Sequence, residues 1–331
     1  MDGLCAKIIE NYDIDVKNIK KTKGYYLINS SAASYALRKT SDTAERIEFR
    51  YKLQENLLAN NFLNIEKIYP TCDGLLFMSH DEQKYILSDH ISGEEADFDN
   101  RDELSKILSK LAEFHKKTVG LESLPEQFYA EDLNVRLTKM VSDFLMLRKK
   151  ISTSKSLSNF DILFLKNHDY YESNINTAAA LLHKANYHGK LMKAFSESSI
   201  CHNMLKKETL VAKDNDIFIS MLSGISVDHF SADISMIISK YMKYSAKRQI
   251  GIMEIIDMYS NSGYNKLDEA DYMIILARLL MPSVFIGTAK QYYMKKRSWA
   301  PSALTTDLEH EISSRAAFLE YTEPLVRVCG I

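Results

Sequence analysis

The ten residues Leu210-Val-Ala-Lys-Asp-Asn-Asp-Ile-Phe-Ile219 have the pattern of a β-hairpin, although the sequence on both sides of them is helical in character. Two apolar segments, residues 210–212 and 217–219, flank the polar residues 213–216, a composition typical of a tight turn between two strands. The order of the elements on either side of this hairpin indicates the fold.

Toward the N-terminus, the first ninety residues are predicted to form strands and one helix. Residues 24–29 and 34–40 are rich in aromatic and apolar side chains, and the small polar residues 30–33 between them predict a hairpin. A helix is predicted from about residue 42 to residue 60, because apolar side chains recur at four-residue spacing along one face. Further strands are predicted at residues 65–71, 75–78 and 84–91.

After an acidic, non-periodic segment at residues 92–100, the sequence becomes mainly helical. Asn100 and Glu103 are typical of a helix N-cap and its reciprocal partner. Apolar stripes predict helices that contain residues 104–114 and 133–147, and further helices near residues 160–185, 233–246, 249–262, 268–281, 286–297 and 305–321. The longest weakly polar run, residues 217–227, is far shorter than the roughly 20 residues that a membrane-spanning helix needs.

These elements predict an α+β protein with two lobes, which the chain length of 331 residues allows. A small antiparallel sheet with one helix is expected in residues 1–91, a connector in residues 92–100, and a larger, mainly helical lobe holding the hairpin in residues 101–331. This order of elements is that of the protein-kinase-like fold.

Charge and cysteine content exclude several classes of function. The 42 basic and 44 acidic residues give a formal net charge of −2, so neither nucleic acid nor a membrane surface is an expected partner. The four cysteines are scattered and predict neither a disulfide framework nor a metal knuckle. No basic segment followed by an apolar one marks a signal peptide at the N-terminus, so we expect synthesis and folding in the cytoplasm.

Several short stretches together resemble a known family. They are Gly24-Tyr25-Tyr26, Tyr35-Ala-Leu-Arg38, Asn61-Phe-Leu-Asn-Ile65, Tyr85-Ile-Leu87, Ile91-Ser-Gly-Glu94, Asp97-Phe98, Leu111-Ala-Glu-Phe-His115, Cys201-His202, the Asp233 region, and Tyr292 with Trp299. In order and spacing the chain resembles the CotS-type spore coat proteins. These are a branch of the kinase-like superfamily that also holds aminoglycoside phosphotransferases and choline kinases. The resemblance implies a place in the endospore coat after synthesis in the mother-cell cytoplasm. Other coat proteins are the implied partners, and self-association is left open.

Phosphoryl transfer in this fold needs a strand lysine for the nucleotide phosphates and a loop aspartate as base. It also needs an asparagine and a second aspartate for Mg²⁺. The resemblance places His202 at the loop histidine, but Arg38 at the strand lysine and Met204 at the base. Thr209 and Met221 fall at the two metal-binding positions. A thioether can neither accept a proton usefully at neutral pH nor bind a hard cation such as Mg²⁺.

We therefore interpret the chain as a catalytically degenerate kinase-like protein, a pseudokinase. The expected role is a structural or scaffolding one in the spore coat, with no catalytic residue, metal or cofactor. Two alternatives remain open. One is a small-molecule phosphotransferase that uses ATP and Mg²⁺ with displaced acids, for which Asp228 is the weak candidate. The other is a nucleotide-binding regulator without turnover. The sequence leaves open whether the chain is an enzyme and favours the interpretation that it is not.

Overall fold

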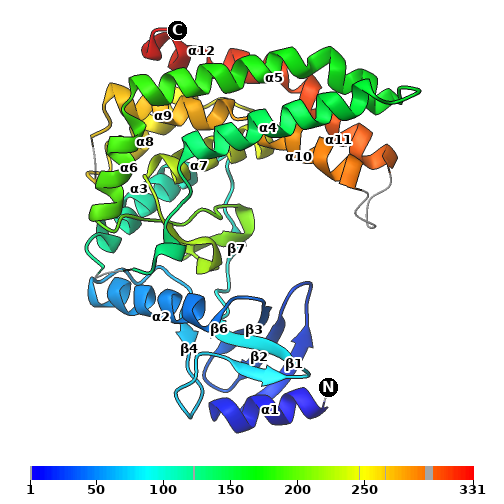
Figure 1. Ribbon diagram of the computed structural model, residues 1–331. Coiled ribbons are helices and arrows are strands. Elements are labelled where there is room, and N and C mark those ends of the chain that lie inside the picture. Colours follow the sequence, from blue (N-terminus) through cyan, green and yellow to red (C-terminus); the bar gives the residue numbers. More distant parts are fainter. Residues whose placement is uncertain (1, 122–123, 246, 265, 295–300) are drawn as a thin grey trace. The chain divides into compact units, whose positions relative to one another are not determined.

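The computed structural model describes residues 2–121, 124–245, 247–264, 266–294 and 301–331, drawn as ribbons in Figure 1. The chain divides into two compact units. Unit 1 comprises residues 1–128 and 197–226, and unit 2 comprises residues 129–196 and 227–331. Unit 1 thus holds the predicted N-terminal lobe, the connector, the first long helix after it, and the late hairpin. The expected boundaries at residues 91 and 101 stay a prediction.

The main sheet of unit 1 is antiparallel, with strand order β1-β2-β3-β6-β4 and β5 paired to β6. Its strands are β1 (Val16–Lys21), β2 (Tyr26–Ser30), β3 (Ser34–Thr40), β4 (Ile68–Tyr69), β5 (Met78–His80) and β6 (Gln83–Asp89). The predicted β2–β3 hairpin is confirmed. Strand β1 was not predicted, because only Val16 and Ile19 are partly buried in it. These two residues are three apart, and exposed polar residues fill the other positions, so the sequence lacks the two-residue alternation of a strand.

Unit 1 contains α1 (Asp2–Tyr12), α2 (Ala44–Ala59) and α3 (Arg101–Thr118), and the short 3₁₀ turns η1 (Glu126–Phe128), η2 (Lys207–Thr209) and η3 (Leu222–Gly224). The predicted N-cap of α3 is confirmed, since the Asn100 side chain accepts from the N–H groups of Asp102 and Glu103. Glu103 pairs with the cap residue through side chains, accepting from Asn100 Nδ2 at 3.4 Å. It also accepts from the N–H of Asp97 at 2.8 Å, which ties the connector to the helix.

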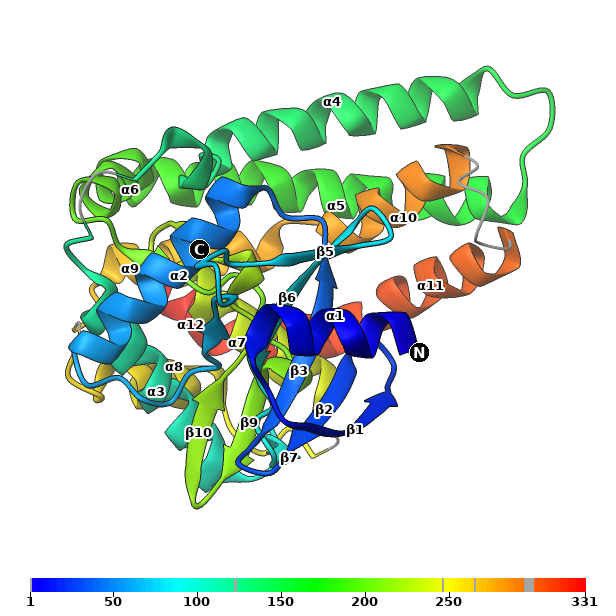
Figure 2. The ribbon, with the colours of Figure 1, turned by 90° about the horizontal axis from the view of Figure 1, so that it is seen from below.

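Two helices cover the two faces of the main sheet. Helix α1 lies across β1, β2 and β3 (Figure 2), and its Ile8 packs in one core with Leu87 of β6. Ile47 of α2 packs instead with Ile86, the neighbour of Leu87 in the same strand. Adjacent strand residues point to opposite faces, so the pair Ile86 and Leu87 anchors both layers.

The late hairpin is confirmed as β9 (Leu210–Lys213) and β10 (Asp216–Ile219), with Asp214 and Asn215 at φ of 51° and 64° in its turn. Strand β7 (Glu94–Glu95), which lies in the connector, adds to β9 as a third strand. Only glycine fits just before β7, because a Cβ at Gly93 would lie 2.5 Å from the carbonyl oxygen of Ala212. The remaining strands are β8 (Ile200–Cys201) and β11 (Ser226–Val227).

Unit 2 is helical. Its helices are α4 (Leu133–Ser152), α5 (Asn159–Lys184), α6 (Tyr187–Ser196), α7 (Ser231–Tyr244), α8 (Ile252–Ser260), α9 (Glu269–Leu280), α10 (Ser283–Met294), α11 (Pro301–Ser313) and α12 (Arg315–Cys329). The prediction of one helix at residues 305–321 was wrong, because two helices meet there at Ser314. Helix α6 was not predicted. The last residues of the helix expected at 286–297, and Trp299, lie outside the described residues.

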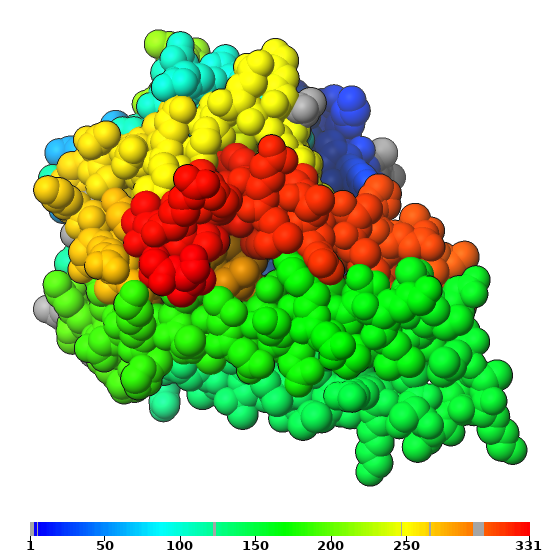
Figure 3. All heavy atoms as spheres, turned by 90° about the horizontal axis from the view of Figure 1, so that it is seen from above, coloured from blue at the N-terminus to red at the C-terminus, as the bar shows by residue number. Residues whose placement is uncertain are grey.

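Aromatic packing forms the middle of unit 2. The buried ring of Phe285 stacks on Tyr171 at 3.9 Å between centroids and on Phe164 at 5.0 Å. Both partners belong to α5, which also runs along α11 (Figure 3). Helix α5 therefore packs against Phe285 of α10 and against α11.

One apolar stretch of unit 2 is longer than the run found by sequence reading. By length and composition alone, Glu269–Tyr293 could cross a membrane. It consists of two helices, α9 and α10, separated by Pro282, and 67% of its apolar window is buried inside the protein. Its apolar side chains are those of core helices.

Candidate functional site

Arg38, at the position that the family resemblance assigns to the strand cation, forms an ion pair in unit 1. Its guanidinium pairs with the Glu66 carboxylate and donates to the Ser88 hydroxyl at 2.8 Å. The side chains of Arg38 and Glu66 are 26% and 7% exposed, so the pair is largely withdrawn from water. The Tyr25 ring lies 5.0 Å from the guanidinium carbon. The positive charge of Arg38 thus already has a counter-charge within the protein.

The other oxygen of Glu66 reaches the residue at the predicted metal position. Glu66 Oε2 accepts from the backbone N–H of Met221 at 2.7 Å. Met221 directly follows the end of the hairpin and has φ 57° and ψ 61°, a left-handed conformation that is rare for a residue with a side chain. The hydrogen bond to Glu66 helps to hold this conformation. One carboxylate therefore joins β3 to the end of β10.

His202 fastens its loop to the same place. Its ring is fully buried, and Nε2 donates to the carbonyl oxygen of Ser220 at 3.0 Å. This assignment follows because Nδ1 accepts from the N–H of Met204 at 3.3 Å, so the ring proton is on Nε2. Thr209 adds a second link, since its carbonyl oxygen accepts from the N–H of Ser220 at 2.9 Å.

The side chains of Met204 and Thr209 are used locally. Met204 is half-buried and packs closely on Gly224. A Cβ at residue 224 would lie 2.3 Å from Cγ of Met204. The Thr209 hydroxyl accepts from the N–H of Lys206 at 2.9 Å and lies 3.2 Å from the carbonyl oxygen of Met204. Both side chains stabilise the loop between His202 and the hairpin.

Asp228, the weak candidate for a displaced metal ligand, lies in unit 2. Its carboxylate forms a buried ion pair with Arg278 at 2.8 Å, and the side chains are 6% and 8% exposed. The same carboxylate accepts from the N–H of His229 at 2.6 Å. Arg278 also donates to the hydroxyl of Ser231 at 3.0 Å, so Asp228 belongs to a buried polar network.

This network continues to Asp271, which sequence reasoning did not single out. His229 lies with Nδ1 2.8 Å from the Ser231 hydroxyl and Nε2 3.5 Å from Asp271, and Lys190 donates to Asp271 at 2.6 Å. Burial lowers the pKa of His229. Burial alone would raise the pKa of Asp271, but hydrogen bonds from His229 and Lys190 outweigh it and lower that pKa to about 2. Ser231, His229 and Asp271 are all buried, so this network lies in the interior of unit 2.

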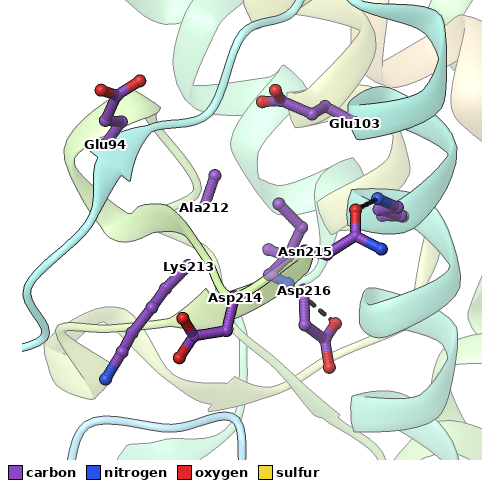
Figure 4. A pocket seen from close by; sticks show the side chains of 9 residues that line it. Glu94, Glu103, Ala212, Lys213, Asp214, Asn215 and Asp216 are labelled. Atoms are coloured by element: carbon purple, nitrogen blue, oxygen red, sulfur yellow. Dashed lines mark hydrogen bonds between the residues drawn. The ribbon is translucent and has the colours of Figure 1, made fainter.

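A polar hollow in unit 1 lies at the turn of the late hairpin (Figure 4). Four carboxylates and two lysines contribute to its lining, which consists of Glu94, Glu103, Lys106, Ala212, Lys213, Asp214, Asn215, Asp216 and Ile217. The ammonium of Lys106 donates to the side-chain oxygen of Asn215 at 2.5 Å. None of the predicted site residues lines this hollow.

The structure thus brings Arg38 and Met221 together through Glu66, and places His202, Met204 and Thr209 in one loop of unit 1. Asp228 belongs to the network of unit 2. Glu66 was missed because no local motif marks it. Its role depends on contacts with residues 28 and 155 positions away in sequence.

The element order and the loop–hairpin geometry define a protein of the kinase-like fold. The sequence model of the family described as "Spore coat putative kinase YutH" matches residues 6–322, and the chain belongs to this family. Spore coat protein S of Bacillus subtilis (strain 168) is 21% identical over 313 residues, which cover 93% of this chain and 89% of that protein. The resemblance to spore coat proteins is confirmed.

Solved structures confirm the predicted fold class. An aminoglycoside phosphotransferase from Alicyclobacillus acidocaldarius superposes with a TM-score of 0.80 at 14% identity, over 97% of this chain and 96% of that chain. A choline kinase from Streptococcus pneumoniae superposes with a TM-score of 0.53 at 14% identity, over 95% of this chain and 98% of that chain. At such identities the likeness establishes the fold alone.

We expect Glu66→Gln to reduce the free energy of unfolding by about 2–3 kcal/mol, because it leaves the partly buried Arg38 guanidinium without its counter-charge. Chemical denaturation would measure the loss. Glu48→Gln is the matched control, since this carboxylate is 57% exposed and its loss should change stability by less than about 0.5 kcal/mol. If the two residues are coupled, the double variant Arg38→Gln/Glu66→Gln should lose less free energy of unfolding than the two single variants lose together. A loss equal to that sum would contradict the coupling.

We expect Asp271 to make stability depend on acid pH. Its pKa is about 2 in the folded chain and about 3.9 when unfolded, so its contribution is complete above pH 4 and is lost as the pH falls toward 2. Between pH 4.5 and pH 2.5, wild type should lose about 2 kcal/mol more stability than Asp271→Asn in denaturant titrations. The exposed Asp257→Asn should follow wild type; an identical loss in all three proteins would refute the assignment.

Proposed function

We propose that this chain is a catalytically degenerate kinase-like protein that serves as a structural or scaffolding component of the bacterial endospore coat. The observation that carries the proposal is that Glu66 contacts both Arg38 and Met221. Its carboxylate neutralises Arg38 and binds the backbone of Met221, so the residues at the phosphate and metal positions are tied to each other.

The side chains at the remaining positions support the same conclusion. Phosphoryl transfer depends on a carboxylate base and on oxygen ligands for Mg²⁺. Met204 and Met221 offer thioethers, which are poor ligands for a hard cation. Thr209 has an oxygen, but its hydroxyl is engaged by the turn in which it lies.

The alternative with displaced acids has less support. Asp228 would have to leave the buried guanidinium of Arg278 to bind a metal ion, and an unpaired buried charge costs about 3–5 kcal/mol. A nucleotide-binding regulator without turnover needs no metal ligand, so this free-energy cost of unpairing Asp228 does not apply to it. The nucleotide test below separates these three functions.

The family supports the rest of the proposal. We propose synthesis in the mother-cell cytoplasm followed by assembly into the coat, with other coat proteins as partners and self-association as a further mode of assembly. The net charge of −2 favours neither nucleic acid nor a membrane surface as a partner.

We expect millimolar ATP to leave the thermal unfolding midpoint unchanged, with or without Mg²⁺, because a ligand stabilises a protein only by binding its folded state. Differential scanning fluorimetry would measure the midpoint. Met204→Asp/Met221→Asp is the matched variant, and a Mg²⁺-dependent shift in it alone would support a site degenerate at these two positions. A Mg²⁺-dependent shift in wild type would favour the phosphotransferase, and a metal-independent one the regulator.

We expect deletion of the gene to alter the layers of the spore coat, because a scaffold determines how its neighbours assemble. Electron microscopy of sections and gel analysis of coat extracts would measure the change. Complementation with the wild-type gene should restore the coat. An intact coat after deletion, with the protein absent from purified spores, would defeat the structural role.

A further inference from the structure

Three metal-ligating side chains lie together on α5 of unit 2. They are His168, Asp169 and Glu172, and their ligand atoms all lie within 4.8 Å of one another. Residues four apart on a helix share a face, which brings His168 and Glu172 together, and Asp169 adjoins both. None of these residues belongs to the kinase-like site of unit 1.

His168 is held in an orientation suited to binding a metal ion. The residue is 8% exposed, and its ring stacks on Phe164 with 6.4 Å between centroids. Nδ1 lies 2.8 Å from the carbonyl oxygen of Leu165. A carbonyl oxygen can only accept, so Nδ1 carries the proton and donates it. Histidine ligands of metal ions are commonly oriented by such a bond from the second ring nitrogen.

The other ring nitrogen, Nε2, is buried and has no hydrogen-bond partner among the described residues. It lies 3.1 Å from Oδ1 of Asp169. In the neutral ring Nε2 has a lone pair, so two electron-rich atoms face each other across this distance. A positive charge between them, either a proton on the ring or a metal ion, is needed to make the arrangement favourable.

We propose that His168, Asp169 and Glu172 bind a divalent transition-metal ion, with Zn²⁺ as the best match. One imidazole nitrogen and two carboxylate oxygens suit a borderline ion better than Mg²⁺, which prefers oxygen ligands throughout. Two ligands about 2.0–2.1 Å from a tetrahedral Zn²⁺ are roughly 3.4 Å apart, close to the observed 3.1 Å.

The surroundings leave room for an ion and for water. The side chain of Asp169 is 86% exposed and Glu172 is half-buried, so one carboxylate faces solvent while the histidine reaches it from the protein side. Three protein ligands and an open position characterise zinc sites that retain a water molecule. The two carboxylates also balance the charge of a divalent cation. Because Phe164 lies under the ring and Phe285 packs on Phe164, the site rests on the aromatic core of unit 2.

Isothermal titration of the full-length chain with Zn²⁺ tests the proposal. The double variant Asp169→Asn/Glu172→Gln should lower the affinity at least tenfold, and His168→Gln should lower it similarly. His183→Gln, which removes an exposed histidine from the same helix, is the matched control and should bind as wild type does. Zinc held by other histidines or cysteines is common to wild type and the two site variants and cancels in their comparison, and His183→Gln measures the effect of removing a histidine outside the site.

Thermal unfolding gives a second measurement, because an ion that binds the folded state raises the midpoint. Zn²⁺ should raise it in wild type and His183→Gln but not in Asp169→Asn/Glu172→Gln. Equal zinc affinity in wild type and the double variant would overturn the proposal. So would an equal midpoint shift with Mg²⁺ at the same concentration, because that result would mean that the carboxylates bind without the histidine.

Discussion

The Glu66 carboxylate is the interaction on which the site in unit 1 depends. It joins Arg38 of the sheet to the backbone of Met221, which follows the late hairpin, and the two links span very different separations along the chain. A partly buried ion pair is weak evidence of stability, because desolvation offsets much of the attraction. Its contribution is better understood as specificity: removing either partner leaves an unpaired charge, so the hairpin end has one favourable position.

This constraint explains how the loop keeps its shape with methionines at the predicted base and metal positions. His202 and Thr209 bind the backbone of Ser220, next to Met221, while Met204 packs on Gly224. All of these contacts use backbone groups or apolar packing, and none requires a metal ion. Under the proposed function, a thioether in place of a carboxylate would remove catalytic chemistry without removing any of these contacts.

Local patterns predicted the late hairpin, the β2–β3 hairpin and the N-cap at Asn100, because each depends on residues close together in sequence. Strand β1 was missed because lysines occupy its exposed positions, and α12 was merged with α11 because no glycine or proline marks the break at Ser314. For the site, the resemblance supplied the positions, but Glu66 and Asp271 could not be found. Their partners lie far away in sequence, and only tertiary structure brings them together.

The pairing of buried charges bears on where ligand chemistry should be sought. A charged side chain that already has a counter-charge gains less electrostatic free energy on binding an ion than a side chain without such a partner. Arg38 has Glu66, Asp228 has Arg278, and Asp271 has Lys190. His168 differs, since its buried Nε2 has no hydrogen-bond partner among the described residues and faces two carboxylates. We therefore expect a cation to bind more favourably at α5, where the lone pair of His168 Nε2 has no hydrogen-bond partner among the described residues. At Met221 the backbone N–H is already bound to Glu66, and the side chain offers only a sulfur atom.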